Sequence, residues 1–426
     1  MTRPPLAAIV LAAGRSTRMR SERPKVLHEV LGLPLVLHVV RAARDAGAER
    51  VVLVVSPEHR EAVAAALAGE EGLDFAVQEE ARGTAHAVLA ARDALGGFRG
   101  TALVLMGDAP CVRPRSLEAL LREHRARAAR CSLLSGRLDD PRGYGRVVRG
   151  PDGDVTAIIE EKDADPATRA LREVNTGTFA LELPACWELL ERVEPSPHTG
   201  ELYLTDVVQL ARASGARVHA EPAADPGDAL GVNTRAQLAQ VTATLRERIN
   251  AEHMARGATI VDPRTTFIDA RACLEEDVRI EPFTVIEGPC RVARGAVVGP
   301  FAHLRGEVEI GPGARVGNFV EVVRSRLGAG SRALHLAYVG DASLGDEVNV
   351  GAGTVFANWD GQRHRECEVG RGASLGANTV LVAPARLGAG ARTGAGAVVV
   401  RTEVPPGDTF VGVPARSRSG AEGSEA

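Results

Sequence analysis

The chain has 426 residues, of which 25% are charged, and its formal net charge is −4 at pH 7. This balance excludes the basic surface that nucleic acid or an anionic membrane requires, so ionic ligands would have to be held by local loops. At roughly 150 residues per domain, the length predicts two or three domains, each large enough to bury a core of its own.

The cysteines and the first apolar run predict a cytoplasmic protein. The six cysteines are widely scattered, with no Cys-x-x-Cys pair and no histidine at metal-binding spacing, which is typical of reduced thiols. The apolar run from Leu6 to Ala13 is too short to span a membrane, and a polar loop follows it in place of a signal-peptide cleavage site.

The first part of the chain, from about residue 5 to 230, alternates short apolar runs with helical patterns. The helical patterns include Val36 to Ala46 and Arg115 to Ala129. The expected strands are Ala7 to Leu11, Arg50 to Val55, Thr101 to Met106 and Thr178 to Leu183. Strands and helices that alternate at this spacing predict a doubly wound, mostly parallel α/β sheet.

The loop after the first strand has the composition of a phosphate site. It reads Leu11-Ala12-Ala13-Gly14-Arg15-Ser16-Thr17-Arg18-Met19, followed by Pro24-Lys25. Ligands of open α/β sheets bind beyond the carboxyl ends of strands, and here small residues expose backbone N–H groups while Arg18 and Lys25 supply charge. The loop lacks both the G-K-[ST] of a P-loop and the G-x-G-x-x-G of dinucleotide folds. An ordinary turn with solvated basic side chains is the alternative.

A carboxylate follows a second strand, in Leu105-Met106-Gly107-Asp108. A lone aspartate there is often only a helix cap, but beside a phosphate loop one carboxylate can hold Mg²⁺, with waters and substrate phosphates as the other ligands. Phosphoryl chemistry of this kind needs positioning and charge neutralisation and no protein nucleophile. Further polar loops, each an ordinary turn by itself, are Gly143 to Arg146, Ile159 to Lys162, Asn175 to Gly177, Leu204 to Asp206 and Gly231 to Asn233.

A helix is expected to join this sheet to the rest of the chain. From Arg235 to about Arg256 there is no glycine or proline, and Leu238, Val241 and Leu245 fall on one helical stripe.

Beyond this helix, an aliphatic residue recurs every six positions from Leu274 to Val322. The period returns from Leu344 to Phe356 and again from Val369 to Val399. It fits neither a helix nor an alternating strand but suits a left-handed parallel β-helix of hexapeptides. The interruption after Phe356 predicts a loop over residues 357–368 that projects from the coil and covers a ligand site. Residues 415–426 are rich in serine, glycine and glutamate and are expected to be disordered.

Taken together, these motifs are recognisable. The first part resembles the sugar-1-phosphate nucleotidyltransferases. The motif order with the coil closely resembles the bacterial bifunctional N-acetylglucosamine-1-phosphate uridylyltransferases/glucosamine-1-phosphate N-acetyltransferases. The resemblance extends to about Pro414 and implies a nucleotidyltransferase domain (1–233), a connecting helix (234–257), an acetyltransferase β-helix (258–414) and a tail (415–426). It also implies a homotrimer whose acetyl-transfer sites are assembled between neighbouring coils.

The resemblance assigns roles in the first domain. Arg18 and Lys25 would be catalytic and, with Leu11, Ala12, Ala13 and Gly14, would hold the UTP phosphates; Gln78, Gly83 and Thr84 would lie near the uracil. Asp108 and Asn233 would bind Mg²⁺. The amino sugar phosphate would contact Gly143, Glu160, Asn175 and Thr205. The family pattern is modified at Ser16, where glycine is usual, and at Ala81, where glutamine is common; neither change removes a charge.

In the coil, His335 resembles the catalytic histidine of the family. Acetyl transfer to an amine needs a base, and histidine, whose ordinary pKa lies near neutrality, suits this role. A lone histidine on a coil would usually be incidental. Its neighbours match family positions, however: Arg305, Glu321, Tyr338 and Asn349 around the sugar phosphate, and Ala352, Asn358, Trp359, Ala377 and Ala395 around acetyl-CoA.

Several coil positions depart from the family pattern. Val323 replaces a lysine on the sugar phosphate, with Arg324 as the nearest substitute, and His364, between two arginines, replaces another. Ala377 stands for a serine and Trp359 for a tyrosine. Losing one charge-assisted phosphate contact costs about 1.5–3 kcal/mol, which slows an enzyme about 10- to 100-fold without abolishing the reaction.

The resulting prediction is a cytoplasmic enzyme that acetylates glucosamine 1-phosphate with acetyl-CoA and then transfers uridylyl from UTP to the product, yielding UDP-N-acetylglucosamine for cell-envelope synthesis. Two alternatives stay open. One is a monofunctional sugar-1-phosphate nucleotidyltransferase whose coil serves only assembly. The other is a non-catalytic regulatory subunit of the same architecture.

Overall fold

The computed structural model describes residues 4–14, 17–151 and 153–418. Arg15 and Ser16 of the expected phosphate loop lie outside these residues. The chain divides into two compact units, residues 1–244 and 245–426. The boundary falls within helix α8 (Arg235–Ala255), the expected connecting helix.

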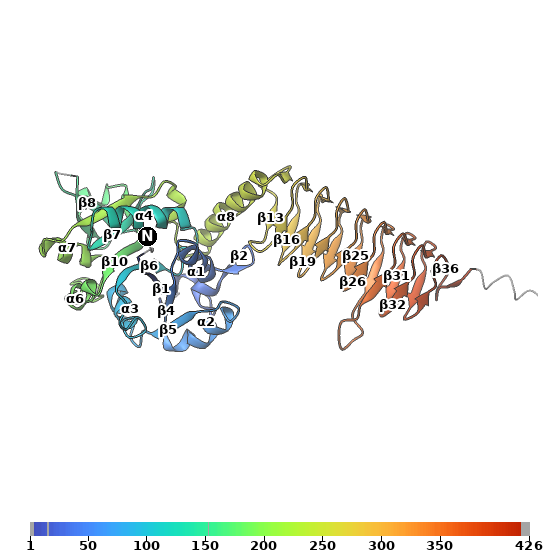
Figure 1. Cartoon of the computed structure of the whole chain (residues 1–426), viewed down its shortest axis with the longest axis horizontal. Coiled ribbons are helices and arrows are strands. Elements are labelled where there is room, and N and C mark those ends of the chain that lie inside the picture. Colours follow the sequence, from blue (N-terminus) through green and yellow to red (C-terminus); the bar gives the residue numbers. More distant parts are fainter. Residues whose placement is uncertain (1–3, 15–16, 152, 419–426) are drawn as a thin grey trace, which may run out of the picture. The chain divides into compact units, whose positions relative to one another are not determined.

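Unit 1 is built on one mixed sheet in the order β11-β7-β10-β6-β1-β4-β5 (Figure 1). Its strands on that path are β1 (Leu6–Leu11), β4 (Arg50–Val55), β5 (Leu73–Val77), β6 (Gly100–Met106), β7 (Cys131–Arg137), β10 (Glu173–Leu183) and β11 (Val218–Pro222). β8 (Arg146–Arg149) pairs with β10 and with β9 (Val155–Ile159), and β2 (Glu29–Val30) forms a separate hairpin with β3 (Leu33–Pro34).

The mostly parallel α/β sheet predicted from the sequence is confirmed. β1 runs parallel to both of its neighbours, β4 and β6. All six residues of β1 are buried, which is why it reads as a continuous apolar run and not as an alternating pattern. Only β10 on the main path runs antiparallel to its two neighbours, and it begins at Glu173, five residues before the expected strand.

Short helices separate these strands. The α-helices of unit 1 are α1 (Leu35–Asp45), α2 (Arg60–Ala66), α3 (Thr84–Ala90), α4 (Pro114–Ala126), α5 (Pro166–Arg169), α6 (Ala185–Glu191) and α7 (Asp206–Ala213), and the 3₁₀ turns are η1 (Thr17–Met19), η2 (Lys25–Leu27), η3 (Pro57–His59) and η4 (Pro226–Ala229). α1 and α4 correspond to the two expected helices. Within the described residues, no helix combines the length and apolar character needed to cross a membrane.

Unit 2 is a parallel β-helix with three walls, consistent with the left-handed hexapeptide coil predicted from the sequence. The first wall contains β12 (Thr259–Ile260), β15 (Arg279–Ile280), β18 (Val297–Val298), β21 (Arg315–Asn318), β24 (Arg332–His335), β27 (Asn349–Val350), β30 (Ser374–Leu375), β33 (Arg392–Thr393), β36 (Thr409–Val411) and β37 (Arg416–Ser417). The second contains β13 (Phe267–Ile268), β16 (Val285–Glu287), β19 (His303–Arg305), β22 (Glu321–Val323), β25 (Tyr338–Gly340), β28 (Val355–Ala357), β31 (Val380–Val382) and β34 (Val398–Val400). The third contains β14 (Cys273–Leu274), β17 (Arg291–Val292), β20 (Glu309–Ile310), β23 (Arg326–Leu327), β26 (Ala342–Leu344), β29 (Cys367–Val369), β32 (Ala385–Leu387) and β35 (Glu403–Val404).

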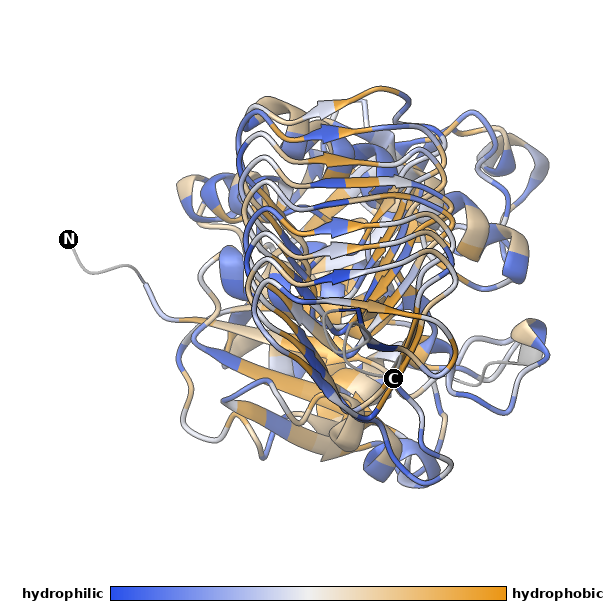
Figure 2. Cartoon of the chain, turned by 90° about the vertical axis from the view of Figure 1, so that its right-hand side faces the viewer, coloured by the Kyte–Doolittle hydropathy of each residue, from blue (hydrophilic) through white to orange (hydrophobic). Residues whose placement is uncertain are grey.

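The six-residue period is explained by the packing of the coil. Successive coils stack in register, as Arg279 pairs with Val297 and Val297 with Arg315, so apolar and polar positions recur from coil to coil (Figure 2). The periodic aliphatic side chains form one continuous buried core. The strict six-residue period ends at Val322, but the core continues beyond it through Leu327, Ala333 and Val339.

Two further expectations need correction. The projecting loop is confirmed, but β28 ends at Ala357 and β29 begins at Cys367, so it spans residues 358–366 (Figure 1). The first residues of the tail that was expected to be disordered are structured, because Ala415 is buried and β37 pairs with β36. Residues 419–426 lie outside the described chain.

Candidate functional sites

A cavity of about 410 Å³ lies at the carboxyl ends of β1 and β6. Because these strands are parallel neighbours, the loops that follow them meet at the same edge of the sheet. The cavity is lined by Leu11, Ala12, Ala13, Gly14, Lys25, Val26, Gln78, Ala81, Gly83, Thr84, Ala87, Met106, Asp108 and Glu201. The cavity therefore brings together the residues predicted for the base, one predicted metal ligand and all of those predicted for the phosphates except Arg18. Met106 and Glu201 had no sequence signal.

Lys25 lies at the centre of the predicted metal site. Its ammonium donates to Oδ1 of Asn233 at 2.9 Å and to the carboxylate of Asp108. Arg18 donates to the same oxygen of Asn233 at 3.0 Å. A carboxylate and an amide oxygen thus converge on one positive charge, although 125 residues separate Asp108 from Asn233 in the sequence. This donor set fits a hard divalent cation, for which the ammonium stands in.

The expected base-binding residues form a tight turn. Nε2 of Gln78 donates to the carbonyl oxygen of Gly83 at 3.0 Å, and the hydroxyl of Thr84 accepts from the backbone N–H of Leu204 at 2.9 Å. Gly83 has φ +117°, and a Cβ at this position would overlap the backbone of Leu202. Glycine is therefore required here for both conformation and space.

The residues expected at the amino sugar lie next to this cavity but do not line it. Thr205 donates its hydroxyl to Glu160 Oε1 at 3.2 Å. Burial raises the pKa of Glu160, against the lowering effect of the Thr205 hydrogen bond. Asn175 donates its backbone N–H to Gly145 at 2.9 Å, and a Cβ on Gly145 would lie 3.3 Å from Glu160 Oε1. Asn175, Glu160 and Thr205 therefore form one group.

Gly143 lies at the edge of this group. Its backbone N–H approaches Oε2 of Glu161 at 3.4 Å, and the same Oε2 accepts from the buried guanidinium of Arg146 at 2.7 Å. Gly143 is thus held on the turn that precedes β8.

In the coil, His335 is the exposed last residue of β24. Its Nδ1 lies 3.1 Å from Oδ1 of Asn318, the residue paired with it on the preceding coil. Asn318 was missed from the sequence. In most of the coil, stacked residues are 18 positions apart, as Val297 and Arg315 are, whereas Asn318 and His335 are 17 apart. The regular period therefore does not pair them.

Three of the residues predicted around acetyl-CoA, Ala352, Ala377 and Ala395, lie on the same corner of the coil as His335, whereas Asn358 and Trp359 lie on the projecting loop. Three backbone hydrogen bonds, of 3.3, 2.7 and 2.8 Å, join this corner to the corresponding corners of the next three coils. The column that they connect contains His335, Ala352, Ala377 and Ala395. Ala377 and Ala395 are exposed and Ala352 is partly exposed, so this column carries only short side chains next to His335.

The expected sugar-phosphate residues divide between two walls. Tyr338 pairs with Glu321 on the second wall, and Glu321 accepts from Nε of Arg305 at 2.6 Å. Nδ2 of Asn358 lies 3.2 Å from the Tyr338 hydroxyl. Asn349 is on the first wall, between Arg332 and Ser374. The structure therefore brings Arg305, Glu321, Tyr338 and Asn358 together and leaves Asn349 on another face of the chain.

Asp341 connects the projecting loop to the coil. Arg324 donates to its two carboxylate oxygens at 2.7 and 2.8 Å, and Nδ1 of His364 lies 3.0 Å from Oδ2. Asn358 donates to the same oxygen. Burial raises the pKa of Asp341, but the hydrogen bonds from Arg324 and Asn358 outweigh it, so the pKa is lowered. Val323, where a lysine was expected, is buried.

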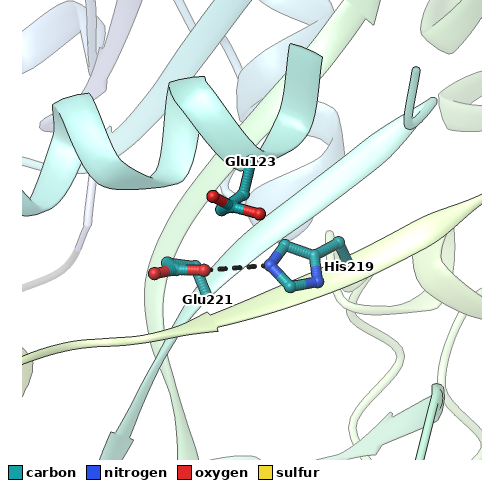
Figure 3. Close-up of side chains that lie close together, drawn as sticks. All are labelled: Glu123, His219 and Glu221. Atoms are coloured by element: carbon teal, nitrogen blue, oxygen red, sulfur yellow. Dashed lines mark hydrogen bonds and ion pairs between the residues drawn. The ribbon is translucent and has the colours of Figure 1, made fainter. Parts of the chain in front are cut away.

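One further group of possible metal ligands occurs in the described residues. Glu123 of α4 and His219 and Glu221 of β11 have ligand atoms within 4.8 Å of one another (Figure 3). His219 Nε2 lies 3.0 Å from Glu221 Oε2, and Arg122 and Arg127 approach Glu123 at 3.4 and 3.5 Å. The carboxylates are therefore already balanced by basic side chains, as in an ordinary surface ion network.

The fold and the cavity define a class of protein: a nucleotidyltransferase joined to a hexapeptide β-helix. Residues 7–225 match the family model described as "Nucleotidyl transferase". The Bifunctional protein GlmU of Geobacter metallireducens is 40% identical, with 94% of each chain covered. The GlmU proteins of Anaeromyxobacter dehalogenans strain 2CP-C and Corynebacterium aurimucosum are 44% and 40% identical, and cover 90% and 94% of this chain and 86% and 90% of their own lengths.

The chain belongs to the bifunctional GlmU family. The resemblance inferred from its motifs is thereby confirmed, and the chain is a transferase with a nucleotidyltransferase unit.

Proposed function

We propose that the chain carries out two successive steps of UDP-N-acetylglucosamine synthesis. Unit 2 transfers acetyl from acetyl-CoA to glucosamine 1-phosphate, and unit 1 transfers uridylyl from UTP to N-acetylglucosamine 1-phosphate, releasing pyrophosphate. The observation that carries the proposal is the cavity at β1 and β6, where the predicted phosphate, base and metal residues meet in a chain of the GlmU family.

In the uridylyl step, an oxygen of the sugar phosphate attacks the α-phosphorus of UTP, and the bond to the leaving pyrophosphate breaks. The attacking oxygen is already an anion, so no protein base is needed. Lys25 and Arg18 neutralise the triphosphate, and the loop from Leu11 to Gly14 approaches it with backbone N–H groups. Gln78, Gly83 and Thr84 hold the uracil end.

Asp108 and Asn233 would hold Mg²⁺ in this site, which would supply further charge neutralisation on the phosphates. The convergence of both oxygens on the Lys25 ammonium supports this assignment. With the two oxygens engaged by the cation, the Lys25 ammonium would be available to the phosphates.

The amino sugar is held by Gly143, Glu160, Asn175 and Thr205. Glu160 accepts from hydroxyl or amide groups of the sugar, and its contact with Thr205 fixes the orientation of the carboxylate. This group borders the cavity through Gly177, because a Cβ on Gly177 would overlap Met106, which lines the cavity.

In the acetyl step, His335 removes a proton from the amine of glucosamine 1-phosphate. When Nδ1 donates to Asn318, Nε2 has the lone pair that accepts this proton. The amine nitrogen bonds to the thioester carbon, the C–S bond breaks, and the proton passes to the sulfur of coenzyme A. The open column of Ala352, Ala377 and Ala395 accommodates acetyl-CoA beside His335.

Arg324 and His364 compensate for the lysines that the family has at positions 323 and 364. Both side chains are held by Asp341 at the root of the projecting loop. Arg324 supplies positive charge beside Tyr338 and Asn358, where the sugar phosphate would lie, and His364 adds a second charge when it is protonated. Trp359, whose ring lies 5.1 Å from that of His364, extends this surface toward acetyl-CoA.

We also propose a homotrimer. Four apolar side chains, each about half exposed or more, form a ladder along one corner of the coil: Phe283 (52%), Phe301 (46%), Phe319 (56%) and Leu336 (64%). The phenyl rings stack at 4.8 and 5.1 Å. Such a patch is typical of an interface. The separation of Asn349 from Tyr338 on different walls supports a site completed by a neighbouring copy.

A cytoplasmic location is part of the proposal. None of the six cysteines forms a disulfide, and five are buried. Burial raises the pKa of the Cys186 and Cys290 thiols to about 12. They therefore behave as packing residues in a reducing compartment.

Two assays on one purified chain test the two activities. Thiol release from acetyl-CoA with glucosamine 1-phosphate should disappear in His335→Ala, and pyrophosphate release from UTP with N-acetylglucosamine 1-phosphate should disappear in Asp108→Asn. Each variant should keep the other activity. Pyrophosphate release without any thiol release would leave a monofunctional nucleotidyltransferase, and failure to bind UTP would leave a regulatory subunit.

A further inference from the structure

The two proposed metal ligands reach the site from strands that are not neighbours. Asp108 follows β6, whereas Asn233 lies beyond the end of β11, and β10 and β7 separate these strands in the sheet. The backbone N–H of Val232 donates to the carbonyl oxygen of Asp108 at 2.9 Å. This hydrogen bond is one of two contacts that join the Asp108 loop to the segment that carries Asn233.

The second contact between these two segments is an ion pair between Arg113 and Asp228. Arg113 lies just before α4 on the Asp108 loop, and Asp228 belongs to η4 on the Asn233 segment. Nε and Nη2 of Arg113 donate to the two oxygens of Asp228 at 2.7 and 2.9 Å. Ser116 donates its hydroxyl to the same carboxylate, and Nη1 of Arg113 lies 3.1 Å from Asp225.

The burial of this pair argues for a positional role. The side chain of Asp228 is fully buried and that of Arg113 is 13% exposed. A buried ion pair adds little stability over a well-packed apolar pair, because desolvation offsets most of the attraction. Its two parallel hydrogen bonds do fix one geometry, however, since the guanidinium fork fits the carboxylate in a single orientation.

We infer that Arg113 and Asp228 are positioning residues that hold Asn233 against Asp108 and thereby set the affinity of the metal site. The inference rests on the proposed function of Asp108 and Asn233 as metal ligands. Neither Arg113 nor Asp228 touches the metal or the substrate. Partners that orient metal ligands in this way typically change metal affinity 10- to 100-fold when they are replaced.

The first test needs no metal. Hydrogen–deuterium exchange of the segment that contains Val232 should become faster in Asp228→Asn, because the segment is no longer held by Arg113. Glu70→Gln is the matched control: Glu70 also accepts the fork of one arginine, Arg41, and a second arginine, Arg44. This control should leave the exchange at Val232 unchanged.

The second test measures the metal. Mn²⁺ binding to the full chain, followed by electron paramagnetic resonance, should be about tenfold weaker in Asp228→Asn and unchanged in Glu70→Gln. In the pyrophosphate assay, the Mg²⁺ concentration for half-maximal rate should rise by a similar factor, while kcat at saturating Mg²⁺ stays within about twofold. A role in general stability alone would not separate these two quantities.

Arg113→Lys keeps the charge but loses the fork, and it carries the same tests if Asp228→Asn does not fold. Wild-type exchange and wild-type Mn²⁺ affinity in a folded variant would overturn the positioning role. Unchanged Mn²⁺ binding in Asp108→Asn would refute the proposed metal site itself. Because this outcome is measured on a different variant, it is distinguishable from a failure of the positioning role.

Discussion

Asp341→Asn should disable the acetyl-transfer site while leaving the uridylyl site intact. The carboxylate of Asp341 accepts from Arg324 and Asn358 and lies beside His364, so it joins the coil to the projecting loop. An asparagine has only one acceptor oxygen at this position. Its amide group would face donors on Arg324 and Asn358, so at least one of these contacts must be lost.

The expected magnitude follows from the geometry. A hydrogen bond to a charged group contributes about 1.5–3 kcal/mol. The side chain of Asp341 is 10% exposed but that of Arg324 is 41% exposed, so solvent screening reduces the loss to about 2 kcal/mol in total. This free energy corresponds to roughly a 30-fold fall in kcat/KM for acetyl transfer, since about 1.4 kcal/mol is a factor of ten.

The assay compares thiol release and pyrophosphate release on the same purified variant. Pyrophosphate release should stay at the wild-type rate, which controls for expression and folding. Because the pKa of Asp341 is lowered below 3.8, its contribution to stability is present above about pH 4 and is lost as the pH falls through the folded-state pKa. Assays near pH 7 therefore report on the ionised carboxylate. Thiol release within threefold of wild type would refute the reasoning about the loop.

Three other outcomes are expected. Gly14→Ala should raise the KM for UTP without changing the melting temperature, because a Cβ there meets no protein atom within 4 Å; Gly83→Ala should also lower the melting temperature, since its Cβ would overlap Leu202. Glu160→Gln should stabilise unit 1 at pH 7 but not at pH 4. Because burial raises the pKa of Glu160 above the usual 4.5, the wild-type protein loses stability as the pH rises through this raised pKa and the carboxyl group ionises. Thermal melts of the wild type and the variant at both pH values measure the difference. If the chain forms the proposed trimer, Phe319→Asp should yield monomers in analytical ultracentrifugation and reduce thiol release while pyrophosphate release persists; a trimeric variant would contradict the assigned interface.

Much of the fold could be predicted because its signals are local. A buried parallel strand such as β1 is a continuous apolar run, and a hexapeptide coil repeats one aliphatic residue per wall, so both are visible within short windows of sequence. The sequence did not determine the start of β10 or the limits of the projecting loop, and it did not predict β37. They depend on which backbone groups find partners on another strand.

The site divides in the same way. The sequence is sufficient to show which loops carry glycine, positive charge and carboxylate and to which family the chain belongs, and it predicts a catalytic role for His335. The contacts within the sites exist only in the folded chain: Lys25 contacts both Asp108 and Asn233, Arg113 pairs with Asp228, and His335 lies against Asn318. These contacts join residues up to 208 positions apart. They depend on the order of the strands and on the register of the stacked coils. In the coil, the step from Val322 to Leu327 is one residue shorter than the period, and the loop over residues 358–366 is inserted. A six-residue period read from the sequence does not predict the register across either change.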